Sequence, residues 1–139
     1  MSKNKIETAL DYLRNGQLII VADDDDREAE GDLVGIANLA TMESVNFMTK
    51  FARGLICAPI SAQLADRLQL TEMVAQNTDT FKTAFTISVD HRSTTTGISA
   101  EERARTIRAL ANPQTKEEDF QKPGHIFPLI GRIGGVLER

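Results

Sequence analysis

The chain has 139 residues and a net charge of −4, with 41% hydrophobic and 26% charged residues. This length fits one domain with a real core, and the composition is typical of a folded protein, which excludes a disordered chain. No apolar run approaches the roughly 18 residues of a membrane span, and neither a signal-peptide core nor a basic run is present. We therefore expect a soluble, cytoplasmic protein that binds neither membrane nor nucleic acid.

The first half of the chain alternates helical and strand-like patterns. Apolar residues at helical spacing predict a helix over residues 6–13 that stops at Asn15-Gly16. The short apolar run at 17–21 predicts a buried strand. The other elements expected here are a strand over 33–37, a helix from its N-cap Thr41 to Gly54, a strand over 55–60, and a short helix capped by Ser61 that reaches about Leu68.

The second half begins with a polar stretch, 71–80, that predicts a loop. Residues 81–90 show the clearest alternation with a period of two in the chain, with Phe81, Thr83, Phe85, Ile87 and Val89 on one side, which predicts a strand. Ser99 and Glu102 form a capping-box pattern that opens a helix ending before Pro113. The remaining expectations are a loop over 91–97, a shorter helix opened by Thr115 and Glu118, a turn at QKPGH (121–125) and a strand over 126–130. Strands and helices mixed over one core predict an α+β or layered α/β fold.

The most informative segment is the acidic loop, VADDDDREAEGD, between the first two expected strands. Seven of the 20 acidic residues fall between Asp23 and Asp32. Such crowding costs electrostatic energy unless a positive group neutralises it, and a hard cation such as Mg²⁺ prefers carboxylate oxygens. Arg27 lies inside the cluster and is placed to bind a substrate oxygen. A solvated acidic turn remains the alternative, whereas a calcium-binding EF-hand loop is excluded because its last ligand position falls on Ala37.

Other candidate residues are ambiguous by pattern alone. His125 follows a Pro-Gly pair and is either a general base or a structural histidine. His91 lies in a polar turn and is expected at the surface, whereas Cys57 lies in an apolar strand and is expected to be a packed thiol. The hydroxyl-rich run 93–99 precedes a helix N-terminus, which suits either an anion or sugar site or a capping loop.

Six segments, in the same order, resemble the 3,4-dihydroxy-2-butanone 4-phosphate synthase family of riboflavin biosynthesis. They cover nearly the whole chain, and the acidic motif followed much later by the Pro-Gly-His motif is highly specific to that family. Lys122 stands where the family usually has arginine. The segments are DDDDREAEGDL (23–33), RGLICAPI (53–60), LTEMVAQNTD (70–79), TAFTISVD (83–90), TTTGISAEERARTIRAL (94–110) and KPGHIFPLIGRIGGVLER (122–139).

The resemblance implies an α+β fold with a layered mixed sheet, and a lyase that converts D-ribulose 5-phosphate into L-3,4-dihydroxy-2-butanone 4-phosphate and formate. It also implies Mg²⁺ or Mn²⁺ as cofactor and a homodimer with active sites near the subunit interface. The implied site residues are Glu28 as metal ligand and catalytic residue, His125 as acid-base catalyst, and Arg27, Asp32, Thr95, Thr96, Cys57 and Arg139 as substrate-binding residues.

The family continues beyond the position of Arg139 through a Gly-His-Thr-Glu segment that supplies a second metal ligand and, further on, a catalytic glutamate. Residues 1–139 are therefore expected to form a single domain that corresponds to the N-terminal two thirds of the family's domain. Two hypotheses follow: a synthase shortened at its C-terminus, whose activity in this form is in doubt, or a degenerate member that acts as a phosphate- or metal-binding or dimerisation module. The sequence does not address fusion to a GTP cyclohydrolase II domain.

Overall fold

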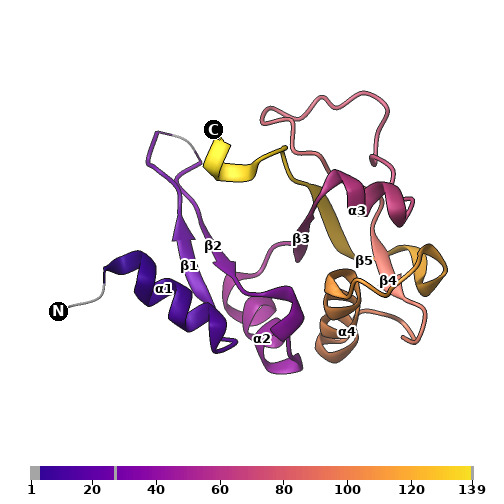
Figure 1. Ribbon diagram of the computed structural model, residues 1–139, viewed down its shortest axis with the longest axis horizontal. Coiled ribbons are helices and arrows are strands. Elements are labelled where there is room, and N and C mark those ends of the chain that lie inside the picture. Colours follow the sequence, from indigo (N-terminus) through magenta and orange to yellow (C-terminus); the bar gives the residue numbers. More distant parts are fainter. Residues whose placement is uncertain (1–3, 27, 139) are drawn as a thin grey trace.

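The computed structural model of the protein describes residues 4–26 and 28–138, and its elements are labelled in Figure 1. The mixture of helices and strands confirms the expected α+β class. The helices are α1 (Lys5–Arg14), α2 (Met42–Phe47), α3 (Ala62–Arg67) and α4 (Ala100–Ala111), and the strands are β1 (Ile19–Ala22), β2 (Gly31–Val34), β3 (Cys57–Ile60), β4 (Val89–His91) and β5 (Phe120–Ile130). Shorter helical turns lie at Ala37–Leu39, Met48–Ala52, Glu117–Asp119 and Gly135–Glu138.

The β1–β2 hairpin carries the acidic loop at its tip. The two strands pair antiparallel, with Val21 opposite Asp32 and Ala22 opposite Gly31. The expected burial of this segment is wrong, because Ile20 is 73% exposed and Val21 is also exposed. The second strand ends at Val34 instead of continuing to 37, since the chain turns there into a 3-10 helix.

A second sheet has the strand order β3-β5-β4 and is mixed. Strands β3 and β5 run parallel, with Cys57 opposite Phe127, whereas β4 and β5 run antiparallel, with Val89 opposite Ile126. The expected turn at residues 121–125 is wrong, because these residues form the first half of β5. Within the described residues, no ladder joins this sheet to the hairpin.

Local capping signals set the helix boundaries. The side chains of Asn4, Thr41, Ser61 and Ser99 each accept a hydrogen bond from a backbone N–H of the first turn. This satisfies one of the donors that a helix start leaves unpaired, so the three N-caps expected at Thr41, Ser61 and Ser99 are confirmed. The second short helix expected near Thr115 is instead a single 3-10 turn, and the Thr115 hydroxyl donates to the carbonyl oxygens of Ala109 and Asn112.

The core lies between α4, α2 and the β3-β5-β4 sheet. Leu68, Val89, Ala104 and Ile126 are fully buried there. The alternation at 81–90 does not separate a buried from an exposed face, because Val89 is fully buried and Thr86, Ser88 and Asp90 on the opposite side are buried as well. The regular ladder also begins only at Val89.

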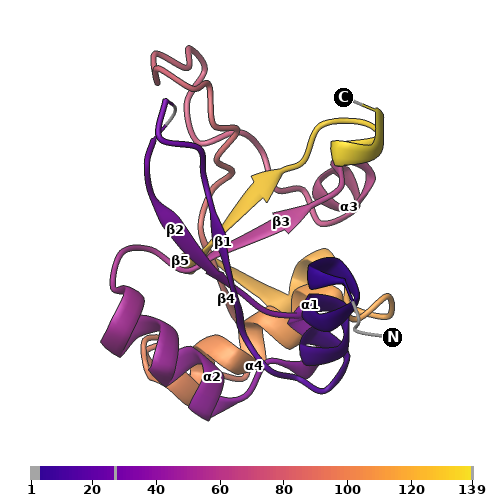
Figure 2. The same ribbon diagram turned by 90° about the vertical axis from the view of Figure 1, so that its left-hand side faces the viewer.

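Figures 1 and 2 show how these parts are arranged. Helices α2 and α4 pack side by side at one end of the molecule. The acidic loop and the 71–82 loop lie at the other end in both views, and the last helical turn lies beside α3 in Figure 2. None of the helices in the described ranges has the length and hydropathy required to cross a membrane.

Candidate active site

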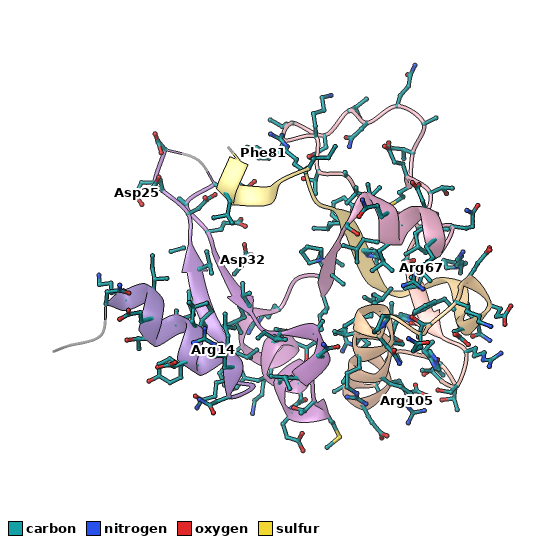
Figure 3. The ribbon with its side chains drawn as sticks, in the orientation of Figure 1. Arg14, Asp25, Asp32, Arg67, Phe81 and Arg105 are labelled. Carbon is teal, nitrogen blue, oxygen red and sulfur yellow. The ribbon has the colours of Figure 1, made fainter. Side chains whose placement is uncertain are left out.

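A cleft of about 1030 Å³ lies between the β1–β2 hairpin and the β3-β5-β4 sheet. Its walls are largely apolar and come from β2, α2, β3 and α4, with Phe85 and Leu129 contributing from the sheet side. In Figure 3, Asp32 lies on the hairpin side of the space between the hairpin and β3. The cleft therefore separates the acidic hairpin from the mixed sheet.

Acidic side chains line the hairpin wall of this cleft. Glu28, Glu30 and Asp32 are all lining residues, and Cys57 lines the wall at β3. The pKa of the Cys57 thiol is raised, mainly because burial disfavours the thiolate and secondarily because the negative charge of Asp32 does the same. Cys57 is thus held as a neutral thiol, which suits a lining residue better than a nucleophile.

The oxygen ligands that Mg²⁺ prefers are present on this wall, but they do not form a complete cage. Among residues 4–26 and 28–138, no group of three or more His, Cys, Asp or Glu side chains is close enough to hold a metal ion. Mg²⁺ usually keeps several waters and takes only one or two carboxylates from the protein. Glu28, Glu30 and Asp32 therefore supply carboxylates of the type that a hard cation prefers, without a complete set of ligands among the described residues.

His125 belongs to a second polar cluster, at β4 and the first half of β5. Its backbone N–H donates to Asp90 Oδ1 at 2.8 Å, and its ring Nδ1 lies 2.8 Å from Asp90 Oδ2. The His125 side chain is 41% exposed, whereas that of Asp90 is 9% exposed. The imidazole is therefore anchored from the protein interior and reachable from solvent.

The hydroxyl-rich loop before α4 is organised by Glu102. The Glu102 carboxylate accepts hydrogen bonds from the backbone N–H and hydroxyl of Thr95 and from the backbone N–H of Gly97. These bonds, those of Thr95 first, lower the pKa of Glu102. The expected reciprocal capping box is thus only half formed, because Ser99 caps the helix while Glu102 holds the loop. Thr96 is exposed beside it.

His125 and Cys57 lie on one face of the mixed sheet. Side chains alternate along a strand, so His125, Phe127 and Leu129 of β5 share a face, and Cys57 is the parallel partner of Phe127. Leu129 and Cys57 both line the cleft. His125 is displaced from Cys57 by one strand and two residues, which is about 8 Å. It does not line the cleft itself, and neither do Thr95 and Thr96.

Two of the expected site residues, Arg27 and Arg139, lie outside the described residues. Two further residues were missed by sequence reasoning. Asp90 was expected on the solvent face of an alternating strand, and Glu102 was expected to complete a cap. Gly97 and Gly124 approach Asp90 closely in the fold, and their lack of a side chain makes this approach possible. They lie 7 and 34 positions from Asp90 in the chain, so no local sequence pattern connects them with it.

Comparison with known proteins agrees with the geometry. The family model of 3,4-dihydroxy-2-butanone 4-phosphate synthase matches residues 7–139. The chain is 60% identical over 136 residues to the 3,4-dihydroxy-2-butanone 4-phosphate synthase of Oceanobacillus iheyensis, covering 98% of this chain and 66% of the relative. It is 58% identical over 134 residues to the riboflavin biosynthesis protein RibBA of Bacillus subtilis, covering 96% of this chain and 34% of the relative.

Solved structures give the same result. A crystal structure of 3,4-dihydroxy-2-butanone 4-phosphate synthase in complex with two magnesium ions superposes with a TM-score of 0.92 and 42% identity, over 99% of this chain and 64% of that chain. The synthase of Candida albicans superposes with a TM-score of 0.86 and 46% identity, over 98% of this chain and 67% of that chain.

The chain combines an α+β fold with an acidic hairpin that lines a cleft. It belongs to the 3,4-dihydroxy-2-butanone 4-phosphate synthase family. It spans about two thirds of the length of the Oceanobacillus relative and about one third of the RibBA relatives.

Proposed function

We propose that the protein acts in riboflavin biosynthesis as a lyase that converts D-ribulose 5-phosphate into L-3,4-dihydroxy-2-butanone 4-phosphate and formate. The observation that carries this proposal is the position of the acidic hairpin wall opposite Cys57, with His125 on the same sheet face as Cys57. Removal and return of protons at sugar carbons requires a positioned acid-base group, and an exposed, anchored imidazole supplies one.

The roles follow from position. His125 takes and returns protons, Asp32 accepts hydrogen bonds from substrate hydroxyls at the cleft wall, and Cys57 shapes the pocket as a neutral thiol. The proposed metal ligand is Glu28, and the ion, Mg²⁺ or Mn²⁺, supplies polarisation of the substrate oxygens when bound. Four further residues are proposed to hold the substrate: Arg27, Thr95, Thr96 and Arg139.

The test is formate release from D-ribulose 5-phosphate with and without Mg²⁺, compared between the parent protein and the Glu28→Ala variant. We expect release that depends on Mg²⁺ and falls by about 100-fold or more in Glu28→Ala, because a metal-assisted step loses several kcal/mol of stabilisation. Glu118→Ala, at an exposed glutamate in the turn Glu117–Asp119, is the matched control and should retain activity.

Metal binding gives a readout that does not need turnover. Electron paramagnetic resonance titration with Mn²⁺ should show weaker binding in Glu28→Ala than in Glu118→Ala. Equal Mn²⁺ binding in the two variants would refute the ligand assignment. Bound Mn²⁺ without formate release would instead favour a metal-binding module that lacks catalytic activity.

We further propose that the protein forms a homodimer in the cytoplasm. Large apolar side chains are exposed, among them Leu55 at the cleft and the nearby Phe51, and a second subunit is able to cover them. The only cysteine, Cys57, has no internal disulfide partner, which suits a reducing compartment. Light scattering coupled to size-exclusion chromatography measures the mass directly, and a monomer at micromolar concentration would contradict the dimer.

A further inference from the structure

Arg53 is the one cation among the described residues that line the cleft. The lining residues also include three carboxylates, those of Glu28, Glu30 and Asp32. The Arg53 side chain makes no hydrogen bond or ion pair with any described residue, and the residue is exposed. A guanidinium is always charged and carries several N–H donors, so in this position it is available to an anion that enters the cleft.

The backbone of Arg53 adopts a conformation that residues with a side chain rarely take. Its φ is +60° and its ψ is −147°, a region that is populated almost only by glycine. Arg53 directly follows the π-helical turn Met48–Ala52, and π turns occur frequently at functional sites. Gly54, the next residue, has a φ of +63° and open space around its Cβ position. Arginine is therefore strained at position 53, and strain of this kind clusters at binding and catalytic sites.

The strand register relates Arg53 to the other candidate site residues. Strands β3 and β5 run parallel, with Cys57 opposite Phe127, and the Phe127 N–H donates to the carbonyl oxygen of Ile56 at 3.1 Å. His125 precedes Phe127 by two residues on β5, and Arg53 precedes Cys57 by four residues. The chain therefore enters β3 from Arg53 at the same end of the sheet at which β5 carries His125. Four residues span at most about 14 Å, which keeps Arg53 close to the lining residue Cys57.

We propose that Arg53 binds the phosphate group of the sugar phosphate substrate, while the acidic wall of the cleft faces the substrate hydroxyls. A phosphate monoester carries nearly two negative charges at neutral pH, so the carboxylates of Glu28, Glu30 and Asp32 repel it. Arginine pairs with phosphate through two parallel N–H···O bonds, which fix the orientation of the ligand as well as its position. The separation of Arg53 from the acidic wall therefore selects one direction of binding. The identity of the ligand rests on the proposed function.

The test compares two ligands that differ only by the phosphate group, D-ribulose 5-phosphate and D-ribulose. Their Kd values are measured by ligand-observed NMR titration of the intact protein without added Mg²⁺. We expect Arg53→Gln to raise the Kd of D-ribulose 5-phosphate by about tenfold to 100-fold, the contribution of hydrogen bonds to a charged group, and to leave the Kd of D-ribulose unchanged. Arg53→Lys keeps the charge without the planar fork and should bind with intermediate affinity. Lys50→Gln is the matched control, because Lys50 is an exposed cation that does not line the cleft, and it should bind as the parent protein does.

Glycine at the same position separates a lost contact from a damaged fold. Arg53→Gly fits a backbone with a φ of +60° and a ψ of −147° without strain, so its Tm should be no lower than that of the parent protein. The same variant should lose as much affinity for D-ribulose 5-phosphate as Arg53→Gln does. A purely structural role of Arg53 gives the reverse result, a lower Tm with an unchanged Kd, and would overturn the proposal.

Three other results would contradict the phosphate-binding role: an unchanged Kd of D-ribulose 5-phosphate in Arg53→Gln, an equal loss of affinity for both ligands, or no binding of D-ribulose 5-phosphate to the parent protein at millimolar concentration. Failure of the proposed function looks different. A protein that binds D-ribulose 5-phosphate through Arg53 but releases no formate contradicts the lyase activity and leaves the role of Arg53 intact. Formate release with an unchanged KM in Arg53→Gln contradicts the role of Arg53 alone.

Discussion

Gly124→Ala is the substitution whose effect the geometry defines most sharply. The added Cβ would lie 2.1 Å from the carbon and 2.4 Å from the oxygen of the Val89 carbonyl, and 2.3 Å from the nitrogen of Asp90. These atoms belong to the backbone, so no side-chain rotation relieves the overlap, and β4 and β5 must separate. The separation also weakens the bond from the Gly124 N–H to Ser88 Oγ. Overpacking of this kind costs about 3 kcal/mol of the free energy of unfolding or more.

The expected change in melting temperature follows from the chain length. An unfolding entropy of about 2.1 cal/mol/K per residue over 139 residues makes each kcal/mol worth about 3–4 °C, so Gly124→Ala should lower Tm by about 10 °C or more. Gly54→Ala is the matched control, because Gly54 has a φ of +63° but nothing within 4 Å of its Cβ position. It carries only the backbone cost, about 1–2 kcal/mol. Calorimetry that finds Gly124→Ala no less stable than Gly54→Ala would refute the described packing.

Three further perturbations test the site and its supports. Asp32→Asn should lower the pKa of Cys57, measured as the pH at which iodoacetamide alkylates the thiol at half its maximal rate. The pKa should nevertheless stay above that of an ordinary thiol, because burial is the larger cause of its rise. Glu102→Gln should flatten the acid side of a plot of Tm against pH. The pKa of Glu102 is lowered, first by the hydrogen bond from the Thr95 backbone, so the ionised carboxylate stabilises the fold above the ordinary glutamate pKa. This stability is lost as the pH falls through the lowered pKa, and glutamine has no such dependence. Ser61→Ala should cost about 1 kcal/mol, or 3–4 °C in Tm, through loss of the α3 cap, and an unchanged Tm would contradict the bond to the helix start.

Sequence patterns predicted the elements whose determinants are local. The caps at Thr41, Ser61 and Ser99 depend on residues three positions away, so they were visible in the sequence. The turn expected at 121–125 was wrong because its Pro-Gly pair has a different function. Gly124 is required for close approach to the backbone of β4, and that need depends on a strand some 35 positions earlier in the chain.

The candidate site was predictable only in part, for the same reason. The acidic cluster is contiguous in sequence, so its position at a hairpin tip was foreseeable from the flanking apolar runs. The environment of His125 was not, because Asp90 was expected to point to solvent on an alternating strand. Its burial results from the register shift in β4 and from Gly97, neither of which has a signature in the local pattern.

The placement of His125 and Cys57 on one sheet face leads to a last prediction, on the distance between them. The register puts His125 about 8 Å from Cys57. Because Val89 pairs with Ile126, next to Phe127, His91 lies two strands from Cys57 and about three residues along the sheet, which is roughly 14 Å. Cys57 is the only cysteine, so a nitroxide label attaches there without other substitutions. Labelling requires raised pH because the pKa of the thiol is raised.

Paramagnetic broadening falls with the sixth power of distance, so the ring signals of His125 should broaden roughly thirtyfold more than those of His91 at these separations. The reduced, diamagnetic label is the control for any change in structure caused by the attachment itself. Equal broadening of both histidines would mean that β5 does not carry His125 and the Cys57 partner on one face. The acidic hairpin and the imidazole would then belong to separate sites, and a single sugar phosphate would be unable to contact both.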